Sequence, residues 1–246
     1  MIRVVSFDID DTLYDFQTAS RHAVGFVVKR IRQALGPDAD GIDAEELIAD
    51  LIAQAASMAN PCVDLPDLRR RSFLRTLRKY GSEDLALAAE LNHVYLEHRF
   101  ETVRPFDDAR ATLARLAEDY TLCAVSNGEQ DLGQLGLDDL FRFTTLPRDA
   151  GVDKPDPRIF LVAMARAGCE ANEFVHVGDS ETSDVMGAKA AGAYAVWFNP
   201  AKRPALPEAK ADAEVARLAE LAGVIKALDG SSVKKESRLR RDTRTG

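Results

Sequence analysis

Short apolar runs recur along the chain, and each has the composition of a strand that is buried on both faces of a sheet. These runs occupy residues 2–7, 120–126, 141–145, 173–178 and 193–198. Helical patterns separate the later runs, at residues 106–119, 156–168 and 183–192. Strands that alternate with helices of this length predict βαβ units and a parallel sheet, with a ligand site at the carboxyl ends of the strands.

Residues 16–103 follow a different pattern, in which apolar positions repeat at the spacing of one helix face. The clearest stripe consists of Val24, Val27, Val28, Ile31 and Leu35. Three further helical segments follow it, and the chain between them is broken by glycine and proline. We therefore expect an α/β domain made of residues 1–15 and 104–230, interrupted by an all-α helical bundle made of residues 16–103.

Charge is distributed unevenly along the chain. The whole chain has a net charge of −8, and residues 231–246 hold six Lys or Arg and two Asp or Glu, so this tail carries +4 and residues 1–230 carry −12. The tail has almost no apolar residues, which predicts a disordered, solvated segment. The acidic remainder argues against binding to a phosphate backbone, so we expect no nucleic-acid partner.

Three cysteines, Cys62, Cys123 and Cys169, lie far apart and lack the spacing of a zinc site. The N-terminal apolar run is too short for a signal peptide, and no apolar stretch is long enough to span a membrane. These features predict a cytoplasmic protein without a membrane partner. They leave open whether the protein is a monomer or a homodimer.

Polar side chains gather where the expected strands end. In chain order they are Asp8 and Asp10, Ser126 and Asn127, Lys154, and Asp179 with Asp184. Because parallel strands bring their carboxyl ends to one edge, we expect these residues to meet there. Side chains alternate along an extended chain, so Asp8 and Asp10 face the same side. Four carboxylates at one edge require cations, for which a divalent ion with oxygen ligands, most naturally Mg²⁺, and the ammonium of Lys154 are suited.

Each of these segments also has a plain structural interpretation. The sequence GDS before a helix is an ordinary N-cap, and Lys154-Pro155 is a common surface turn. We interpret Asp11 and Asp15 as turn or cap residues, and His176 as a hydrogen-bonded core histidine. Four arginines of the helical segment, Arg21, Arg69, Arg70 and Arg71, could reach a substrate, but we assign them to a solvated face. All four plain interpretations of the strand-end segments would have to hold at once, which requires four coincidences. We therefore favour one shared functional site at this edge of the sheet.

The four segments DIDDT, SNG, DKPDPRIF and GDSETSD resemble, in content and order, the signatures of the haloacid dehalogenase superfamily of phosphoryl-transfer enzymes. The resemblance extends to about residue 200. It implies a Rossmann-like parallel sheet of about five strands. The helical bundle of residues 16–103 is similar in position to the α-helical cap of that superfamily, between the first and second signatures.

The resemblance also implies roles for individual residues. Asp8 matches the nucleophile that forms an aspartyl-phosphate, and Asp10 matches the general acid and base. Ser126, Asn127 and Lys154 match the groups that bind the transferring phosphoryl group, and Lys154 is also a catalytic cation. The Mg²⁺ ligands are then Asp8, the backbone carbonyl of Asp10, and Asp179, with Asp184 orienting the metal shell or Lys154.

The function expected from the resemblance is a Mg²⁺-dependent phosphatase that hydrolyses a small phosphorylated metabolite. A phosphomutase of the same fold, a haloacid dehalogenase and a catalytically idle binding module remain alternatives. Asp10 argues against the dehalogenase, because members of that branch lack the acid/base carboxylate. Nothing in residues 16–103 identifies the substrate.

Overall fold

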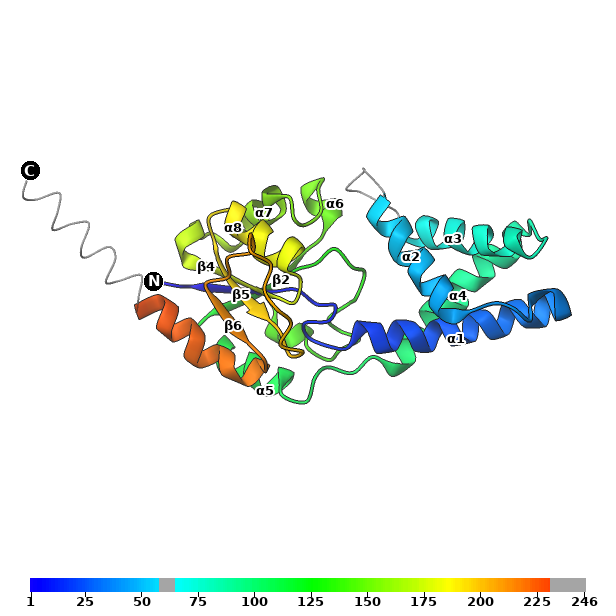
Figure 1. The fold of residues 1–246 in the computed structure, drawn as a ribbon. Coiled ribbons are helices and arrows are strands. Elements are labelled where there is room, and N and C mark those ends of the chain that lie inside the picture. Colours follow the sequence, from blue (N-terminus) through cyan, green and yellow to red (C-terminus); the bar gives the residue numbers. More distant parts are fainter. Residues whose placement is uncertain (58–64, 231–246) are drawn as a thin grey trace, which may run out of the picture. The chain divides into compact units, whose positions relative to one another are not determined.

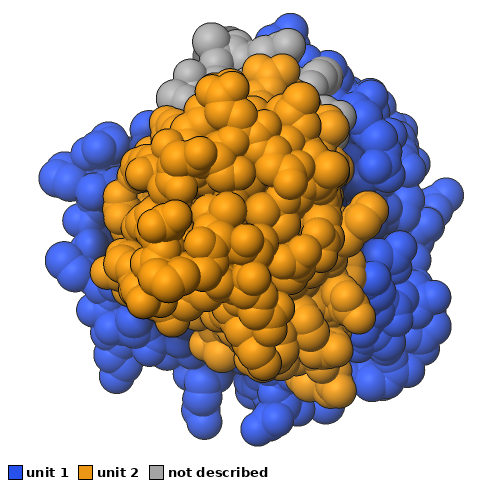
Figure 2. All heavy atoms as spheres, turned by 90° about the vertical axis from the view of Figure 1, so that its right-hand side faces the viewer, with its two compact units in different colours: residues 1–14, 105–246 blue, residues 15–104 orange. Residues whose placement is uncertain are grey.

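A computed structural model describes residues 1–57 and 65–230, with the side chains of residues 54–57 left aside (Figure 1). The predicted disordered tail, residues 231–246, lies outside the described residues. The chain divides into two compact units, which Figure 2 colours separately. Residues 1–14 and 105–246 form the α/β unit, and residues 15–104 form the helical unit.

A six-stranded, fully parallel sheet forms the centre of the α/β unit. Its strands are β1 (Val4–Phe7), β2 (Thr121–Val125), β3 (Thr144–Thr145), β4 (Phe174–Gly178), β5 (Tyr194–Phe198) and β6 (Ala213–Val215). The strand order is β3-β2-β1-β4-β5-β6, so the chain winds outward from β1 in both directions. This reversal of strand order makes the carboxyl end of β1 a topological switch point, where such sheets bind ligands.

The α/β fold with a parallel sheet confirms the prediction from the apolar runs. The sheet has a sixth strand that the sequence did not indicate, because β6 is a three-residue edge strand with an exposed Glu214 instead of an apolar run. The run at residues 141–145 forms only the two-residue β3. The helix expected at residues 183–192 is a π-helical turn, Glu181–Met186, followed by α8 (Gly187–Ala190).

Helices cover both faces of the sheet (Figure 1). The helices α6 (Pro147–Ala150), α7 (Pro157–Ala167) and α8 lie on one side, and α5 (Ala109–Ala117) lies on the other with the helix of residues 221–230. Val125, Phe160 and Trp197 belong to the buried apolar cluster on the α7 side. Burial of apolar surface on both faces is what holds a parallel sheet of this kind together.

Four main helices make up the described part of the helical unit: α1 (Phe16–Leu35), α2 (Ala44–Ser57), α3 (Leu65–Lys79) and α4 (Leu85–Thr102). The predicted stripe on α1 lies in the core, with Val24, Val27 and Ile31 fully buried. Asp15 is the N-cap of α1 and accepts a hydrogen bond from the Thr18 N–H, which confirms its assignment as a cap residue.

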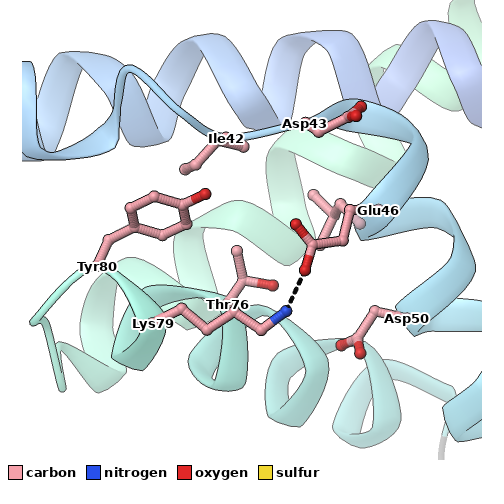
Figure 3. A pocket seen from close by; sticks show the side chains of 8 residues that line it. Ile42, Asp43, Glu46, Asp50, Thr76, Lys79 and Tyr80 are labelled. Carbon is pink, nitrogen blue, oxygen red and sulfur yellow. Dashed lines mark hydrogen bonds and ion pairs between the residues drawn. The ribbon is translucent and has the colours of Figure 1, made fainter.

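Two further observations bear on the helical unit. A small pocket between α2 and α3 is lined by residues that include Glu46, Asp50 and Lys79, and an ion pair joins Lys79 to Glu46 across it (Figure 3). Asp50 accepts hydrogen bonds from Ser72 and Arg75, so Asp50, Glu46 and Lys79 all have partners within the helical unit. Among the residues described, no helix is both long and apolar enough to cross a membrane.

Candidate active site

Three neighbouring strands deliver polar side chains to the switch point at the carboxyl end of β1. Asp8 directly follows β1, and its backbone N–H donates to the carbonyl of Val177 on β4 at 2.8 Å. Ser126 follows β2, and Asp179 follows β4. The parallel register pairs Phe7 with residues of both β2 and β4, so the residues after these strands are brought to one edge, as expected.

Lys154 reaches this edge from the segment between α6 and α7. Its Nζ lies 2.5 Å from Oδ1 of Asp8 and 2.7 Å from Oδ1 of Asp184, and the residue is only 4 % exposed. The side chain of Asn127 anchors the Lys154 backbone in both directions. Its Nδ2 donates to the Lys154 carbonyl at 2.9 Å, and its Oδ1 accepts from the Lys154 N–H at 2.8 Å. Lys154 does lie in a turn, between the exposed Asp153 and Pro155, but its side chain is a fixed, buried cation.

Asp184 is the most firmly held carboxylate of the cluster. Its Oδ1, which accepts from Lys154, also lies 3.1 Å from Nε2 of His176. Its Oδ2 accepts from the Ser180 N–H at 3.0 Å. The other ring nitrogen of His176 lies 3.0 Å from Oγ of Ser6, so the buried ring has a partner on each side. Gly178 makes room for this arrangement, because a Cβ there would collide with the Asp184 carboxylate.

One ammonium thus serves two carboxylates in different surroundings. Burial alone raises the pKa of Asp184, but the charge of Lys154 and the hydrogen bond from His176 outweigh it and hold this pKa below its usual value. Burial raises the pKa of Asp8 well above its usual value, because Lys154 offsets burial only in part and Asp184 adds repulsion. For Lys154, burial lowers the pKa, and the two carboxylates outweigh burial so that the pKa is raised.

Asp179 lies at the same edge and is held mainly through its backbone. Its N–H donates to Oγ1 of Thr12 at 3.1 Å. Its carbonyl accepts from Nε1 of Trp197 and from Nη2 of Arg203, both at 2.9 Å. Burial raises the pKa of the Asp179 carboxyl to about 7, and the negative charge of Asp184 contributes in the same direction. The carboxylate is therefore positioned by its backbone, and Arg203, whose Nη2 lies 4.0 Å from its Oδ2, offsets the effect of burial only in part.

The carboxyl oxygens of Asp8, Asp179 and Asp184 form a set that could hold a metal ion, with one oxygen of each lying within 4.8 Å of the others. Oxygen ligands of this kind suit a hard divalent cation. Asp184 already accepts three hydrogen bonds, which leaves Asp8 and Asp179 as the carboxylates with coordinating capacity. Burial, with a smaller contribution from neighbouring carboxylates, raises the pKa of both residues, and a bound cation would favour their ionised forms.

Asp10 belongs to the same edge but is outside this set of three carboxylates. The phenol of Tyr14 donates to its Oδ1 at 2.6 Å. Gly128 permits the close approach of the same carboxylate, because a Cβ at Gly128 would overlap Oδ2 of Asp10. The Gly128 N–H also donates to Oγ of Ser126 at 3.1 Å, so Gly128 touches both side chains.

The structure brings together all the residues expected at the site. Asp8, Lys154, Asp179 and Asp184 form one cluster, and Asp10, Ser126 and Asn127 border it through the contacts given above. Both polar atoms of the Asn127 side chain contact the Lys154 backbone. A contact between Asn127 and phosphate, as expected from the sequence, would therefore use the second N–H of the amide, which these two hydrogen bonds do not involve.

Sequence reasoning missed four supporting residues: Thr12, Tyr14, Trp197 and Arg203. Thr12 is the last residue of the DIDDT segment, so its place in that segment could have identified it. Tyr14 lies four residues after Asp10, and this nearness in sequence is a weaker indication of their contact. Trp197 and Arg203 are distant from Asp179 in sequence, and no local pattern connects them. His176 is the hydrogen-bonded core histidine that was expected, and its partner Asp184 links it to the site.

Comparison with known proteins identifies relatives over nearly the whole chain. The family model for haloacid dehalogenase-like hydrolases matches residues 2–192. The chain is 30% identical over 241 residues to a glyceraldehyde 3-phosphate phosphatase of Methanopyrus kandleri, with 93% of this chain and 99% of that protein covered. It is also 30% identical to the 5-amino-6-(5-phospho-D-ribitylamino)uracil phosphatase YigB of Escherichia coli, covering 81% of this chain and 84% of that protein.

Solved structures with the same fold are also found. A 2-haloacid dehalogenase from Pseudomonas syringae is 33% identical, with a TM-score of 0.74, over 92% of this chain and 99% of that one. The putative hydrolase YfnB of Bacillus subtilis, whose structure is described as bound to magnesium, is 25% identical, with a TM-score of 0.70, over 91% and 98%.

Proposed function

The chain belongs to the haloacid dehalogenase-like hydrolases, and we propose that it is a Mg²⁺-dependent phosphatase that hydrolyses a small phosphorylated metabolite through an aspartyl-phosphate on Asp8. The proposal rests mainly on one observation. A buried carboxylate, Asp8, is held against the ammonium of Lys154 at the switch point of the sheet, within reach of two further carboxylates. A loose phosphoryl transition state requires this combination of a fixed nucleophile and surrounding positive charge.

The protein residues divide the chemistry into two steps. In the first, a carboxylate oxygen of Asp8 bonds to phosphorus while the bond from phosphorus to the ester oxygen breaks, and Asp10 gives its proton to the departing alkoxide. In the second, Asp10 takes a proton from water, the water oxygen bonds to phosphorus, and the bond to Asp8 breaks to release inorganic phosphate. The hydrogen bond from Tyr14 orients the Asp10 carboxylate for both proton transfers.

Binding of the phosphoryl group is assigned to Ser126, Asn127 and Lys154. The hydroxyl of Ser126 follows β2 beside the nucleophile, and the ammonium of Lys154 neutralises charge that develops on the phosphoryl oxygens. Asn127 contributes mainly by fixing the Lys154 backbone. Because Lys154 is held by hydrogen bonds before any substrate arrives, it needs no reorganisation during the reaction.

For the metal, we assign Asp8, Asp179 and the backbone carbonyl of Asp10 as the protein ligands, with Asp184 positioning Lys154 behind them. A bound Mg²⁺ would supply charge neutralisation between the Asp8 carboxylate and the phosphate dianion. The closeness of the Asp8 and Asp179 carboxylate oxygens supports this assignment, and so does the magnesium in the similar hydrolase YfnB.

The substrate is assigned only by class. The phosphatase relatives are named for different small phosphate esters, which supports a phosphorylated metabolite without choosing among them. We assign the helical unit, residues 15–104, as the cap of the enzyme and the source of contacts to the leaving group. In that assignment, the α/β unit handles the phosphoryl group whatever alcohol is attached.

A haloacid dehalogenase is the second candidate, because the Pseudomonas syringae structure with that name is 33% identical to this chain. Such an enzyme uses the same aspartate on carbon and needs no acid that protonates an alkoxide. A carboxylate at Asp10, held in place by Tyr14, favours the phosphatase, since cleavage of a phosphate ester needs an acid that protonates the departing oxygen.

One assay separates the two candidates. The protein, treated with a chelator and then titrated with Mg²⁺, is given para-nitrophenyl phosphate, and chloroacetate in a parallel reaction. We expect phosphate release that requires Mg²⁺ and no chloride release. Metal-independent chloride release without phosphatase activity would replace the proposal by the dehalogenase, and neither activity would favour a binding module.

A further inference from the structure

Arg99, in the last turn of α4, is a buried cation whose hydrogen-bonding capacity is largely unused. The residue is only 3 % exposed. Its Nε and Nη2 atoms are buried, and among the described residues neither has a hydrogen-bond partner. Leaving buried donors of a charged group without partners costs stability, so an arginine in this state calls for an explanation.

Aromatic rings surround the guanidinium. Its Cζ lies 4.6 Å from the ring centroid of Phe100, 5.7 Å from that of Phe16 and 5.8 Å from that of Tyr95. Cation–π contacts of this kind stabilise the charge but leave the N–H groups at the edge of the guanidinium unsatisfied. Phe16 begins α1 and Phe100 is near the end of α4, so Arg99 lies at the end of the helical unit where its chain enters and leaves.

A second arginine, Arg69, contacts one of the aromatic rings that contact Arg99. The Cζ of Arg69 lies 5.6 Å from the centroid of the Tyr95 ring, and Nε of Arg69 donates to Oδ1 of Asn92 at 2.8 Å. Arg69 is 7 % exposed, so its assignment to a solvated face was wrong. Two buried guanidiniums thus share one tyrosine ring in a protein whose overall charge is negative.

The unused atoms of Arg99 are the two that bind a carboxylate side-on. Nε and Nη2 point in parallel and match the two oxygens of a planar carboxylate. Three other arginines of this chain use that same edge. Arg30 binds Glu90, Arg75 binds Asp50, and Arg158 binds Asp156, each through Nε and Nη2. Arg99 has the same edge and, among the described residues, no carboxylate on it.

We infer that the Nε and Nη2 edge of Arg99 is a binding site in the helical unit for the carboxylate of a small organic acid. The dry, aromatic surroundings strengthen such an ion pair, because the low local dielectric increases the attraction between guanidinium and carboxylate. Since both atoms are buried, the acid reaches them only when neighbouring side chains move. The stability lost through an unsatisfied cation is regained when the carboxylate binds.

The carboxylate has two possible sources. It belongs either to a free acid or to the leaving group of the phosphate ester itself. If the carboxylate belongs to the leaving group, the inference rests on the proposed phosphatase function. It then narrows the substrate class to phosphate esters of hydroxy acids. Both sources share one chemistry, and binding measurements distinguish them without relying on turnover.

Calorimetry on the full-length protein tests the site directly. Titrations with glycolate measure binding of a free acid to the wild type, to Arg99→Met and to Arg99→Lys. Titrations with phosphoglycolate and with ethyl phosphate, which lacks the carboxylate, use the Asp8→Asn background to prevent hydrolysis. We expect Arg99→Met to weaken either glycolate or phosphoglycolate by roughly ten- to a hundredfold, without a matching loss for ethyl phosphate.

Two variants separate this role from a structural one. Arg99→Lys keeps the charge and the cation–π contacts but lacks the two-pronged edge, so it should lose the same discrimination. Arg30→Met, which removes a carboxylate-paired arginine from the same unit, should leave all ligands unaffected. If Arg99→Met is poorly folded, Arg99→Lys alone decides the matter.

Loss confined to glycolate assigns a free acid, and loss confined to phosphoglycolate assigns the leaving group. Equal binding of both acids by the wild type and by the folded Arg99 variants would overturn the inference. The release of phosphate from para-nitrophenyl phosphate is measured separately, so failure of the proposed phosphatase function is recognised independently of the result at Arg99.

Discussion

The ammonium nitrogen of Lys154 lies 2.5 Å from Oδ1 of Asp8, although 146 positions separate the two residues in the chain. The contact is buried, and the same ammonium is shared with Asp184. A shared cation lets two carboxylates stay close without neutralising both of them. The shared cation offsets part of the repulsion within the cluster, and the remaining negative charge suits the metal ion proposed for this site.

Asp8→Asn should abolish phosphatase turnover and leave the fold intact. The amide cannot act as the nucleophile, and it removes one charge from a repulsive cluster in which the pKa of Asp8 is raised by burial. The melting temperature without Mg²⁺ should therefore be unchanged or higher than that of the wild type. Phosphate release and calorimetric melting measure the two effects, and wild-type rates in this variant would refute the assignment of Asp8.

Lys154→Met should lose both activity and stability. Removing the ammonium leaves Asp8 and Asp184 buried without their cation, which costs about 3–5 kcal/mol for a buried pair of this kind. Lys189→Met is the matched control, because Lys189 forms a more exposed ion pair with Asp212 and should change stability by about 1 kcal/mol or less. Urea unfolding of the two variants gives the comparison, and equal losses would contradict a special role for Lys154.

Gly128→Ala should impair catalysis through the position of Asp10. An added Cβ would overlap the Asp10 carboxylate, which must move away from Tyr14 and from its place at the sheet edge. We expect kcat to fall by about a hundredfold, the lower range for loss of general acid–base catalysis. In Gly25→Ala the new Cβ meets nothing within 4 Å, so kcat should not change. A fully active Gly128→Ala would remove Asp10 from the proton-transfer role.

The pH dependence of stability should reveal Asp179. Its pKa of about 7 in the folded protein lies above the usual value of a carboxyl group, so the folded state binds more protons than the unfolded state at intermediate pH. The contribution of Asp179 to stability is therefore complete at low pH and is lost as the pH rises toward 7 and beyond. Other groups titrate in this range, and the difference between the wild type and Asp179→Asn isolates this one.

Mg²⁺ should reverse that loss. The ion binds the ionised carboxylate, so the rise in melting temperature on adding Mg²⁺ should be larger at pH 8 than at pH 5.5 and should be much smaller in Asp179→Asn. Ca²⁺ at the same concentration tests whether any divalent ion has this effect. An equal Mg²⁺ response in Asp179→Asn would exclude this residue as a ligand.

The sequence by itself determined the parallel sheet and the edge at which the site lies. A strand buried on both faces must be apolar at successive positions, so β1, β2, β4 and β5 are visible as continuous runs. Asp8, Ser126 and Asp179 directly follow such strands, and parallel geometry then places them together. For these residues, local pattern and fold carry the same information.

Tertiary structure alone decided how the charges are paired and which of them are buried. Lys154 lies outside any helix or strand, and the contacts of its Nζ with Asp8 and Asp184 show that its side chain points inward. Arg69 and Arg99 look like other arginines on amphipathic helices, because helical periodicity reports which face is apolar and not which cation the bundle encloses. Burial of a charged side chain depends on neighbours that are distant in sequence, and a local pattern contains no record of them.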